Sequence, residues 1–163
     1  MMKILIVNAT ILALLIVCSP SAIAQSSALL HDTELSAESG RINVKLLVAA
    51  PSDSQGCKTA SSWRWGAENT CPNTLIGAVE VRVNTGLAFV PLSAFADLGN
   101  PRIVRIEGRK GEGRFAVIVI GGDAATSYKA TLEFRKDLLL ERVVRHGEFP
   151  AESWERTIYK FNR

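Results

Sequence analysis

His146 is the residue of this 163-residue chain best suited to acid–base chemistry, because imidazole titrates near neutral pH. The carboxylates of Glu148, Glu152 and Glu155 follow it closely in the sequence. A histidine with nearby acids could serve a carboxylate-dependent hydrolase, to which Asp123 could also contribute. Scattered acids on a solvated loop give the same pattern, and no serine or cysteine nucleophile motif accompanies them. We therefore predict a non-catalytic protein.

Basic side chains between residues 102 and 114 could bind carboxylates or phosphates, since guanidinium groups present planar hydrogen-bonding forks. Glu107 and Glu112 interleave with these cations. A solvated strand face is therefore the alternative, and the sequence favours it over a binding patch. The run consists of Arg102, Arg105, Arg109, Lys110 and Arg114, of which Arg105, Arg109 and Arg114 are the candidate binding residues.

Two tryptophans, Trp63 and Trp65, lie in an otherwise polar segment. In an extended segment residues two apart point to the same side, so both indoles would form one aromatic surface with Arg64 facing away. Such a surface suits a sugar ring or a protein hot spot, and we take all three residues as binding candidates. The alternative, that one or both indoles fold back to cover the end of the core, stays open.

The first 24 residues predict a secretory signal peptide, because Lys3 precedes the apolar run 4–17 and a small-residue end. We expect cleavage after Ala24. The apolar run is short for a membrane span. Lipidation at Cys18 is disfavoured, because Val17 stands where such sites carry a small residue. We therefore predict an exported protein, periplasmic or extracellular, without stable membrane insertion after cleavage.

Cleavage would leave two cysteines in an oxidising compartment, which predicts a disulfide between Cys57 and Cys71. A ring of about 15 residues contributes about 3 kcal/mol in the simple loop-entropy treatment, and it would pin the loop 51–73. Zinc is the competing ligand, but the chain has no C-x-x-C spacing, and its imidazoles, His31 and His146, lie far from the cysteines. No metal or cofactor is expected.

The mature chain, residues 25–163, has the length of one domain. It keeps 18 of the 19 Lys and Arg, because Lys3 is lost, against 16 Asp and Glu, for a net charge of +2. This balance argues against nucleic acid or an anionic membrane as the main partner. We expect another exported protein, or a glycan.

Period-two alternation of apolar and polar residues predicts strands through most of the mature chain. Residues 115–120 are apolar on both faces, which indicates a central, covered strand. Residues 91–101 predict one or two helical turns with Gly99 in a left-handed cap, and residues 25–40 indicate either a lead-in or a short edge element. The predicted strands are 42–48, 75–83, 87–90, 104–107, 115–120, 128–134, 138–145 and 157–161.

About eight short strands without long crossover helices predict an all-β, mainly antiparallel fold, either a sandwich or a partly closed barrel, with one short helical insertion. A rigid scaffold without a catalytic motif favours an exported binding protein, of inhibitor or immunity type, acting on a secreted or cell-wall enzyme. The alternatives are a carbohydrate-binding module using Trp63 and Trp65, a carrier of hydrophobic ligands, and a carboxylate-dependent hydrolase.

Overall fold

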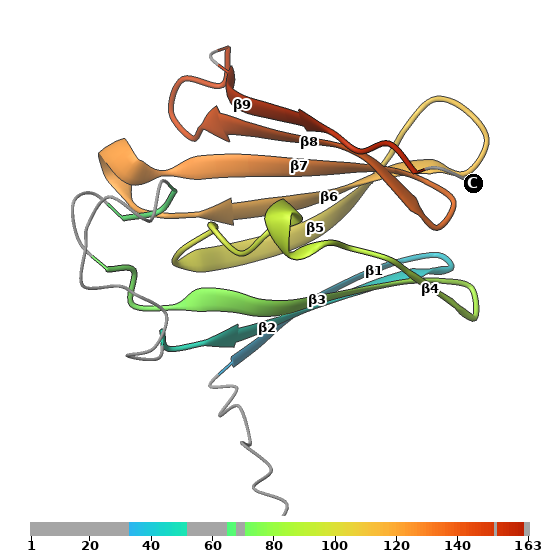
Figure 1. Cartoon of the computed structure of the whole chain (residues 1–163), viewed down its shortest axis with the longest axis horizontal. Helices are drawn as coiled ribbons and strands as arrows, with labels where there is room; N and C mark the ends of the chain where they lie inside the picture. Colours follow the sequence, from blue (N-terminus) through green and yellow to red (C-terminus); the bar gives the residue numbers. More distant parts are fainter. Residues whose placement is uncertain (1–32, 52–64, 68–70, 152, 162–163) are drawn as a thin grey trace, which may run out of the picture.

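The structure, a computed structural model, describes residues 33–51, 65–67, 71–151 and 153–161. Nine strands in these residues form two antiparallel sheets that pack face to face (Figure 1). The smaller sheet has the order β1-β2-β3-β4 and the larger has the order β5-β6-β7-β8-β9. The prediction of an all-β sandwich is therefore confirmed.

The four-stranded sheet contains β1 (Thr33–Ser39), β2 (Ile42–Ala49), β3 (Leu75–Val83) and the short β4 (Gly86–Ala88). Residues 33–39 of the opening segment form the predicted edge element, because β1 is an edge strand with mostly exposed side chains; residues 25–32 lie outside the described residues. Its period-two signal is weak because an edge strand buries few of its residues. The hairpin from β3 to β4 follows the predicted turn.

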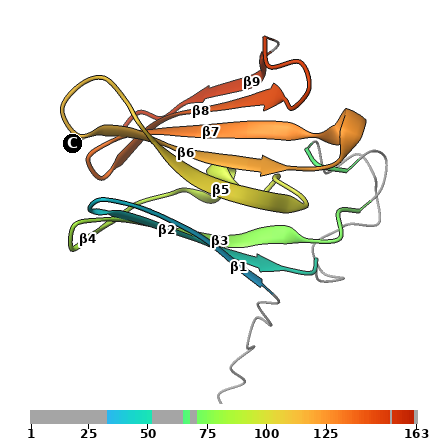
Figure 2. The same cartoon turned by 180° about the vertical axis from the view of Figure 1, so that it is seen from behind.

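The five-stranded sheet is a meander in which each strand pairs with the next along the chain (Figure 2). Short turns suffice for such antiparallel neighbours. Its strands are β5 (Pro101–Gly108), β6 (Arg114–Gly121), β7 (Tyr128–Arg135), β8 (Leu138–His146) and β9 (Ser153–Ile158).

The last strand differs from its prediction, because β9 begins at Ser153 and ends at Ile158 rather than covering 157–161. Glu155 pairs with Val144 of β8, and Thr157 pairs with Arg142. The inward positions of β9, Glu155 and Thr157, are polar because they lie next to the buried Arg142. Their polarity hides the strand from a search for alternating apolar residues.

The predicted helical insertion is a single 3₁₀ turn, η3 (Leu92–Ala94). The left-handed position falls on Asn100, whose φ is 48°, so the prediction of a left-handed Gly99 was wrong. Gly99 instead permits close packing, because a Cβ there would lie 2.6 Å from Cβ of Pro72. A second 3₁₀ turn, η4 (Ala124–Thr126), was not predicted.

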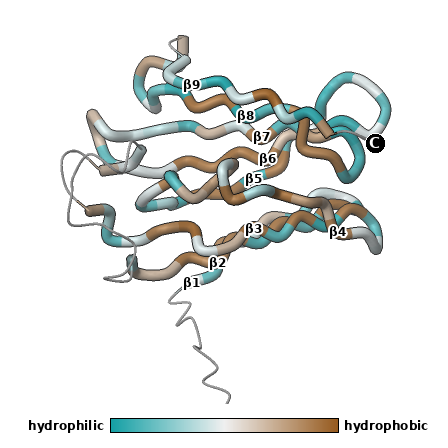
Figure 3. Tube along the Cα trace, in the orientation of Figure 1, coloured by the Kyte–Doolittle hydropathy of each residue, from teal (hydrophilic) through white to brown (hydrophobic). Residues whose placement is uncertain are grey.

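The core lies between the two sheets. Phe115 and Phe134 stack in it with ring centroids 5.0 Å apart, and Tyr128 is fully buried at the other end of β7. In Figure 3 the most hydrophobic stretch of the larger sheet follows β6, which is buried on both faces as predicted. The large side chains of this interior do not favour the alternative of a hydrophobic-ligand carrier.

Several predictions fall on segments outside the described residues: the signal peptide, Cys57, Trp63 and Arg64. Cys71 is described and is not a free side chain, but its predicted disulfide with Cys57 stays a prediction. Within the described ranges no helix has the length and apolar character needed to span a membrane.

Candidate binding groove on the five-stranded sheet

The outer face of the larger sheet carries a row of polar and charged side chains on β7 and β8. Residues directly opposite each other in an antiparallel pair point to the same face, so the register fixes which side chains meet. Three pairs form the floor of this face: Lys129 with Arg145, Thr131 with Val143, and Glu133 with Glu141.

The tip of the β5–β6 hairpin, residues 109–113, forms one wall beside this floor; it is the yellow-orange loop in Figure 1. Nε of Arg109 donates a hydrogen bond of 2.9 Å to Glu133, and its Nη1 donates one of 2.9 Å to Glu107. The backbone N–H of Lys136 donates to the carbonyl of Gly113 at 2.7 Å. The tip is therefore attached to the end of β7 at Glu133 and to the β7–β8 turn at Lys136.

These two ion pairs shift the pKa values of Glu107 and Arg109. The hydrogen bond from Arg109 lowers the pKa of the Glu107 carboxyl below its usual value, with the charge of Lys129 adding to the effect. The hydrogen bond to Glu133 raises the pKa of Arg109. Both shifts keep the charged forms in place.

Floor and hairpin tip together enclose a groove of about 620 Å³, which we call the basic groove. An adjoining depression of about 520 Å³ shares Arg114 with it, and its other charged residues are Arg135 and Lys136 with the acidic Glu112 and Asp137. Five basic side chains against two acidic ones give the groove a surplus of positive charge. The basic residues are Arg109, Lys110, Arg114, Lys129 and Arg145, and the acidic residues are Glu133 and Glu141.

Both acids of the groove form ion pairs with arginines, whereas most of its cations have no ion pair within the described residues. Glu133 pairs with Arg109, and Glu141 pairs with Arg156, whose pKa that hydrogen bond raises. Among the described residues no acid forms an ion pair with the other cations. These unmatched cations of the groove are Lys110, Arg114, Lys129 and Arg145.

Two of the three arginines singled out in the sequence, Arg109 and Arg114, meet in the basic groove. Arg105 lies on β5 and pairs with Glu107 at 3.3 Å, outside the groove lining. The sequence did not indicate Lys129 and Arg145, because they lie on two different strands and only the register brings them together. An outward cation on each of two consecutive strands was the signal that could have found them.

Trp65 does not display its ring. The residue is 9% exposed. Its backbone forms an isolated β-bridge with Leu98, and its carbonyl oxygen accepts a hydrogen bond of 3.1 Å from the Gly99 N–H. Its indole stacks on that of Trp154, with centroids 4.8 Å apart and planes 10° apart. For Trp65 the structure therefore agrees with the core-covering alternative, while Trp63 and Arg64 lie outside the described residues.

His146 holds a turn together. Its Nδ1 accepts hydrogen bonds from the backbone N–H groups of Glu148 at 3.0 Å and Phe149 at 3.2 Å. Its Nε2 lies 3.2 Å from the carbonyl oxygen of Ala125, so Nε2 carries the proton and donates. Both ring nitrogens are thus engaged with the backbone.

Two of the acids named for the hydrolase alternative form ion pairs with arginines. Asp123 pairs with Arg102 at 2.8 Å, and Glu155 pairs with Arg142 at 2.9 Å. Glu152 lies outside the described residues. Across the described ranges no three histidine, cysteine, aspartate or glutamate side chains come close enough to hold a metal ion.

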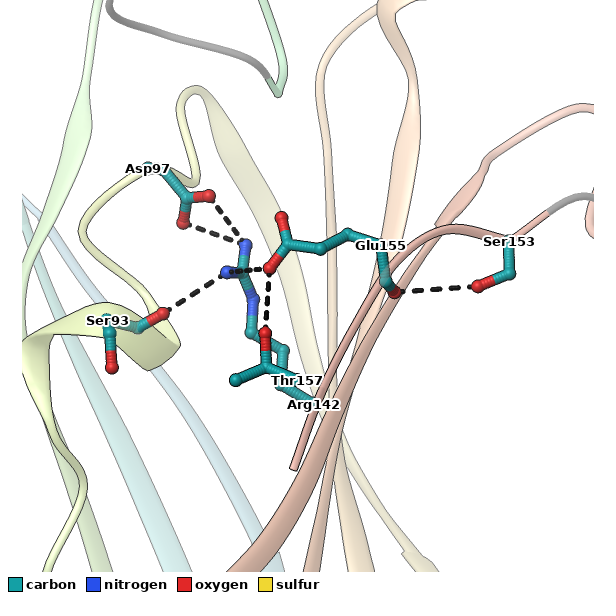
Figure 4. Close-up of polar contacts among 6 residues, drawn as sticks. All are labelled: Ser93, Asp97, Arg142, Ser153, Glu155 and Thr157. Carbon is teal, nitrogen blue, oxygen red and sulfur yellow. Dashed lines mark hydrogen bonds and ion pairs between the residues drawn. The ribbon is translucent and has the colours of Figure 1, made fainter. Parts of the chain in front are cut away.

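The inner face of the same sheet contains a buried arginine, which the sequence analysis missed. Arg142 is 2% exposed, and its Nη2 donates to both carboxylate oxygens of Asp97 at 2.8 Å (Figure 4). Its Nη1 donates to Glu155 at 2.9 Å and to the carbonyl of Ser93 at 3.2 Å. This network fastens the segment around η3 to β8 and β9.

Fold and surface together define an antiparallel β-sandwich with a basic groove on the outer face of its larger sheet. Comparison with protein-family models, with curated proteins and with solved structures found no match to this chain. The chemistry of the groove therefore carries the functional proposal.

Proposed function

We propose that this protein is an exported, non-catalytic binding protein of inhibitor or immunity type, and that an acidic surface of another exported protein docks in its basic groove. The observation that carries the proposal is the set of four groove cations without an acidic partner in the described residues. A groove with surplus positive charge selects a partner of opposite charge and steers its approach.

The wall and floor of the groove support this function. The hairpin tip is fixed by the pairs of Arg109 with Glu133 and Glu107, so the groove is built before any partner arrives. A preorganised surface loses less conformational entropy on binding than a mobile one. Arg114 adds a guanidinium fork that matches a carboxylate in two hydrogen bonds. Arg145 adds a second guanidinium, whose Nη1 donates to the carbonyl of Pro150 at 3.0 Å.

A capture experiment with three forms of the mature protein tests the proposal. The groove variant is Lys129→Gln with Arg145→Gln, and the charge-matched control is Lys45→Gln with Arg82→Gln on the other sheet. We expect wild type and control to recover the same partner from an extracytoplasmic extract, and the groove variant to lose about tenfold in affinity for the purified partner. Equal binding by the groove variant, or no partner for any form, would overturn the proposal.

A glycan is the second candidate, and one observation favours it. Trp154 is 37% exposed while its ring lies flat against Trp65, and the nearby Phe149 is 60% exposed. Exposed rings on a rigid support suit stacking against sugars. Loss of glycan retention in Phe149→Ala with unchanged stability would promote this candidate, whereas unchanged retention would remove it.

A further inference from the structure

Two pairs of like charges lie at opposite ends of β7. Lys129 is directly opposite Arg145 at one end, and Arg135 is directly opposite Arg114 at the other. Like charges in directly opposed positions destabilise a sheet, so neither pair is explained by folding. Arg135 lies six positions after Lys129, which corresponds to about 20 Å along an extended strand.

The middle of the groove is different in character. Glu133 and Glu141 are also directly opposite each other, but Arg109 and Arg156 neutralise them. The neighbouring pair, Thr131 with Val143, carries no charge. The floor therefore presents cations at both ends, separated by the paired charges of Glu133 and Glu141 and by an uncharged pair. The remaining unmatched cation, Lys110, lies on the hairpin tip, and Glu112 and Asp137 also line the Arg114–Arg135 end.

We propose, on the basis of the function proposed above, that the occupant is an extended acidic segment of a partner protein, with carboxylates near both ends and small uncharged side chains between them. An extended polypeptide rises about 3.3 Å per residue, so about seven residues span the two cation pairs. The chemistry of the two ends matches carboxylates. Arg114 and Arg135 each offer a fork of N–H donors, and Arg145 offers the donors that its hydrogen bond to Pro150 does not use.

The middle of the groove favours this occupant over a uniform polyanion. A sulfated or phosphorylated polymer carries negative charge along its whole length, and some of it would lie over Glu133 and Glu141. Like-charge contact of that kind costs affinity. A polypeptide with uncharged residues at its centre avoids this contact.

Fluorescence anisotropy with labelled peptides tests the spacing. One peptide carries two acidic residues at each end of an uncharged middle, and its isomer carries all four acidic residues at one end. We expect the first to bind the mature protein about tenfold more tightly than the isomer at low salt. We expect Lys129→Gln with Arg145→Gln, and Arg114→Gln with Arg135→Gln, each to remove most of that preference.

The charge-matched control, Lys45→Gln with Arg82→Gln, should keep the preference, and thermal melts check that every variant is folded. Equal binding of both peptides, weakened alike by both groove variants, would overturn the spacing while leaving the proposed function intact. Tighter groove-dependent binding of a heparin fragment would identify a polyanion site and overturn the protein segment. Binding that neither groove variant weakens would overturn both proposals.

Discussion

Two arginine clusters lie back to back on the five-stranded sheet, and they differ in how their charges are matched. Arg142 and Arg145 are three residues apart on β8 and point to opposite faces. On the inner face Arg142 meets Asp97 and Glu155. On the outer face Arg145 has no acidic partner among the described residues and lies opposite Lys129.

Solvent explains this difference. A buried charge without a partner costs several kcal/mol, so the inner arginine must be matched within the chain itself. An exposed charge is stabilised by water and can remain unmatched at little cost to the fold. The inner cluster therefore specifies how the η3 segment docks on β8 and β9. In the outer cluster Nη1 of Arg145 donates to the carbonyl of Pro150 at 3.0 Å, and the positive charge itself is left for an acidic group of another molecule.

Arg142→Leu should have the largest effect on stability of the substitutions considered. It leaves the carboxylates of Asp97 and Glu155 together without their cation, and we expect the free energy of unfolding to fall by about 3–5 kcal/mol. The matched control is Arg145→Leu on the same strand, for which we expect a change within about 0.5 kcal/mol. Chemical denaturation of both variants gives the two values.

A third variant distinguishes the loss of charge pairing from the loss of packing. Combining Arg142→Leu with Asp97→Asn and Glu155→Gln removes all three charges, and it should recover much of the lost stability because no charge is then left unpaired. If the triple variant is no more stable than Arg142→Leu, the loss comes from packing rather than from unmatched charge.

The sequence predicted the fold where burial and alternation coincide, and not elsewhere. Strand β7 alternates fully buried with partly exposed residues, so its pattern was plain. Strand β1 packs only Leu35 and Ala37 against the core, which leaves too few apolar positions for a clear signal. Strand β9 was misplaced because Glu155 occupies an inward position that only Arg142 makes favourable.

The binding groove could be predicted in part. Arg109 and Arg114 were found because they belong to one short run of the sequence. Lys129 and Arg145 are close only through the register of β7 and β8, which a pattern of alternation does not fix. The direction of Trp65 likewise depends on its contacts with Leu98 and Gly99, which are distant in sequence.

Tyr128 is a second buried polar group, and its phenol makes stability depend on pH in the alkaline range. Burial, together with the charge of Asp97, raises the pKa of its phenol above the ordinary value. Above about pH 10 the unfolded chain therefore releases this proton while the native protein keeps it. Stability is fully present below that pH and should fall by about 1.4 kcal/mol for each further unit.

Tyr128→Phe isolates this effect from the titration of surface lysines. Its hydroxyl has no hydrogen-bond partner among the described residues, so the substitution should leave stability at neutral pH nearly unchanged. Chemical denaturation between about pH 8 and pH 11 should show a smaller alkaline loss in the variant. The same slope in both proteins would assign the loss to other groups.

Arg145→Glu gives a small expected gain in stability and tests the fold and the binding function with one substitution. It converts the like-charge pair with Lys129 into an opposite-charge pair, which should raise the free energy of unfolding by about 0.2–1 kcal/mol. The same change places a negative charge in the basic groove and should weaken binding of the acidic peptide by about tenfold or more. Denaturation and anisotropy on one preparation measure both effects.

A gain in stability with lost binding would show that this cation is retained at the expense of the fold. A loss of both stability and binding would mean that Arg145 supports the sheet as Arg142 does.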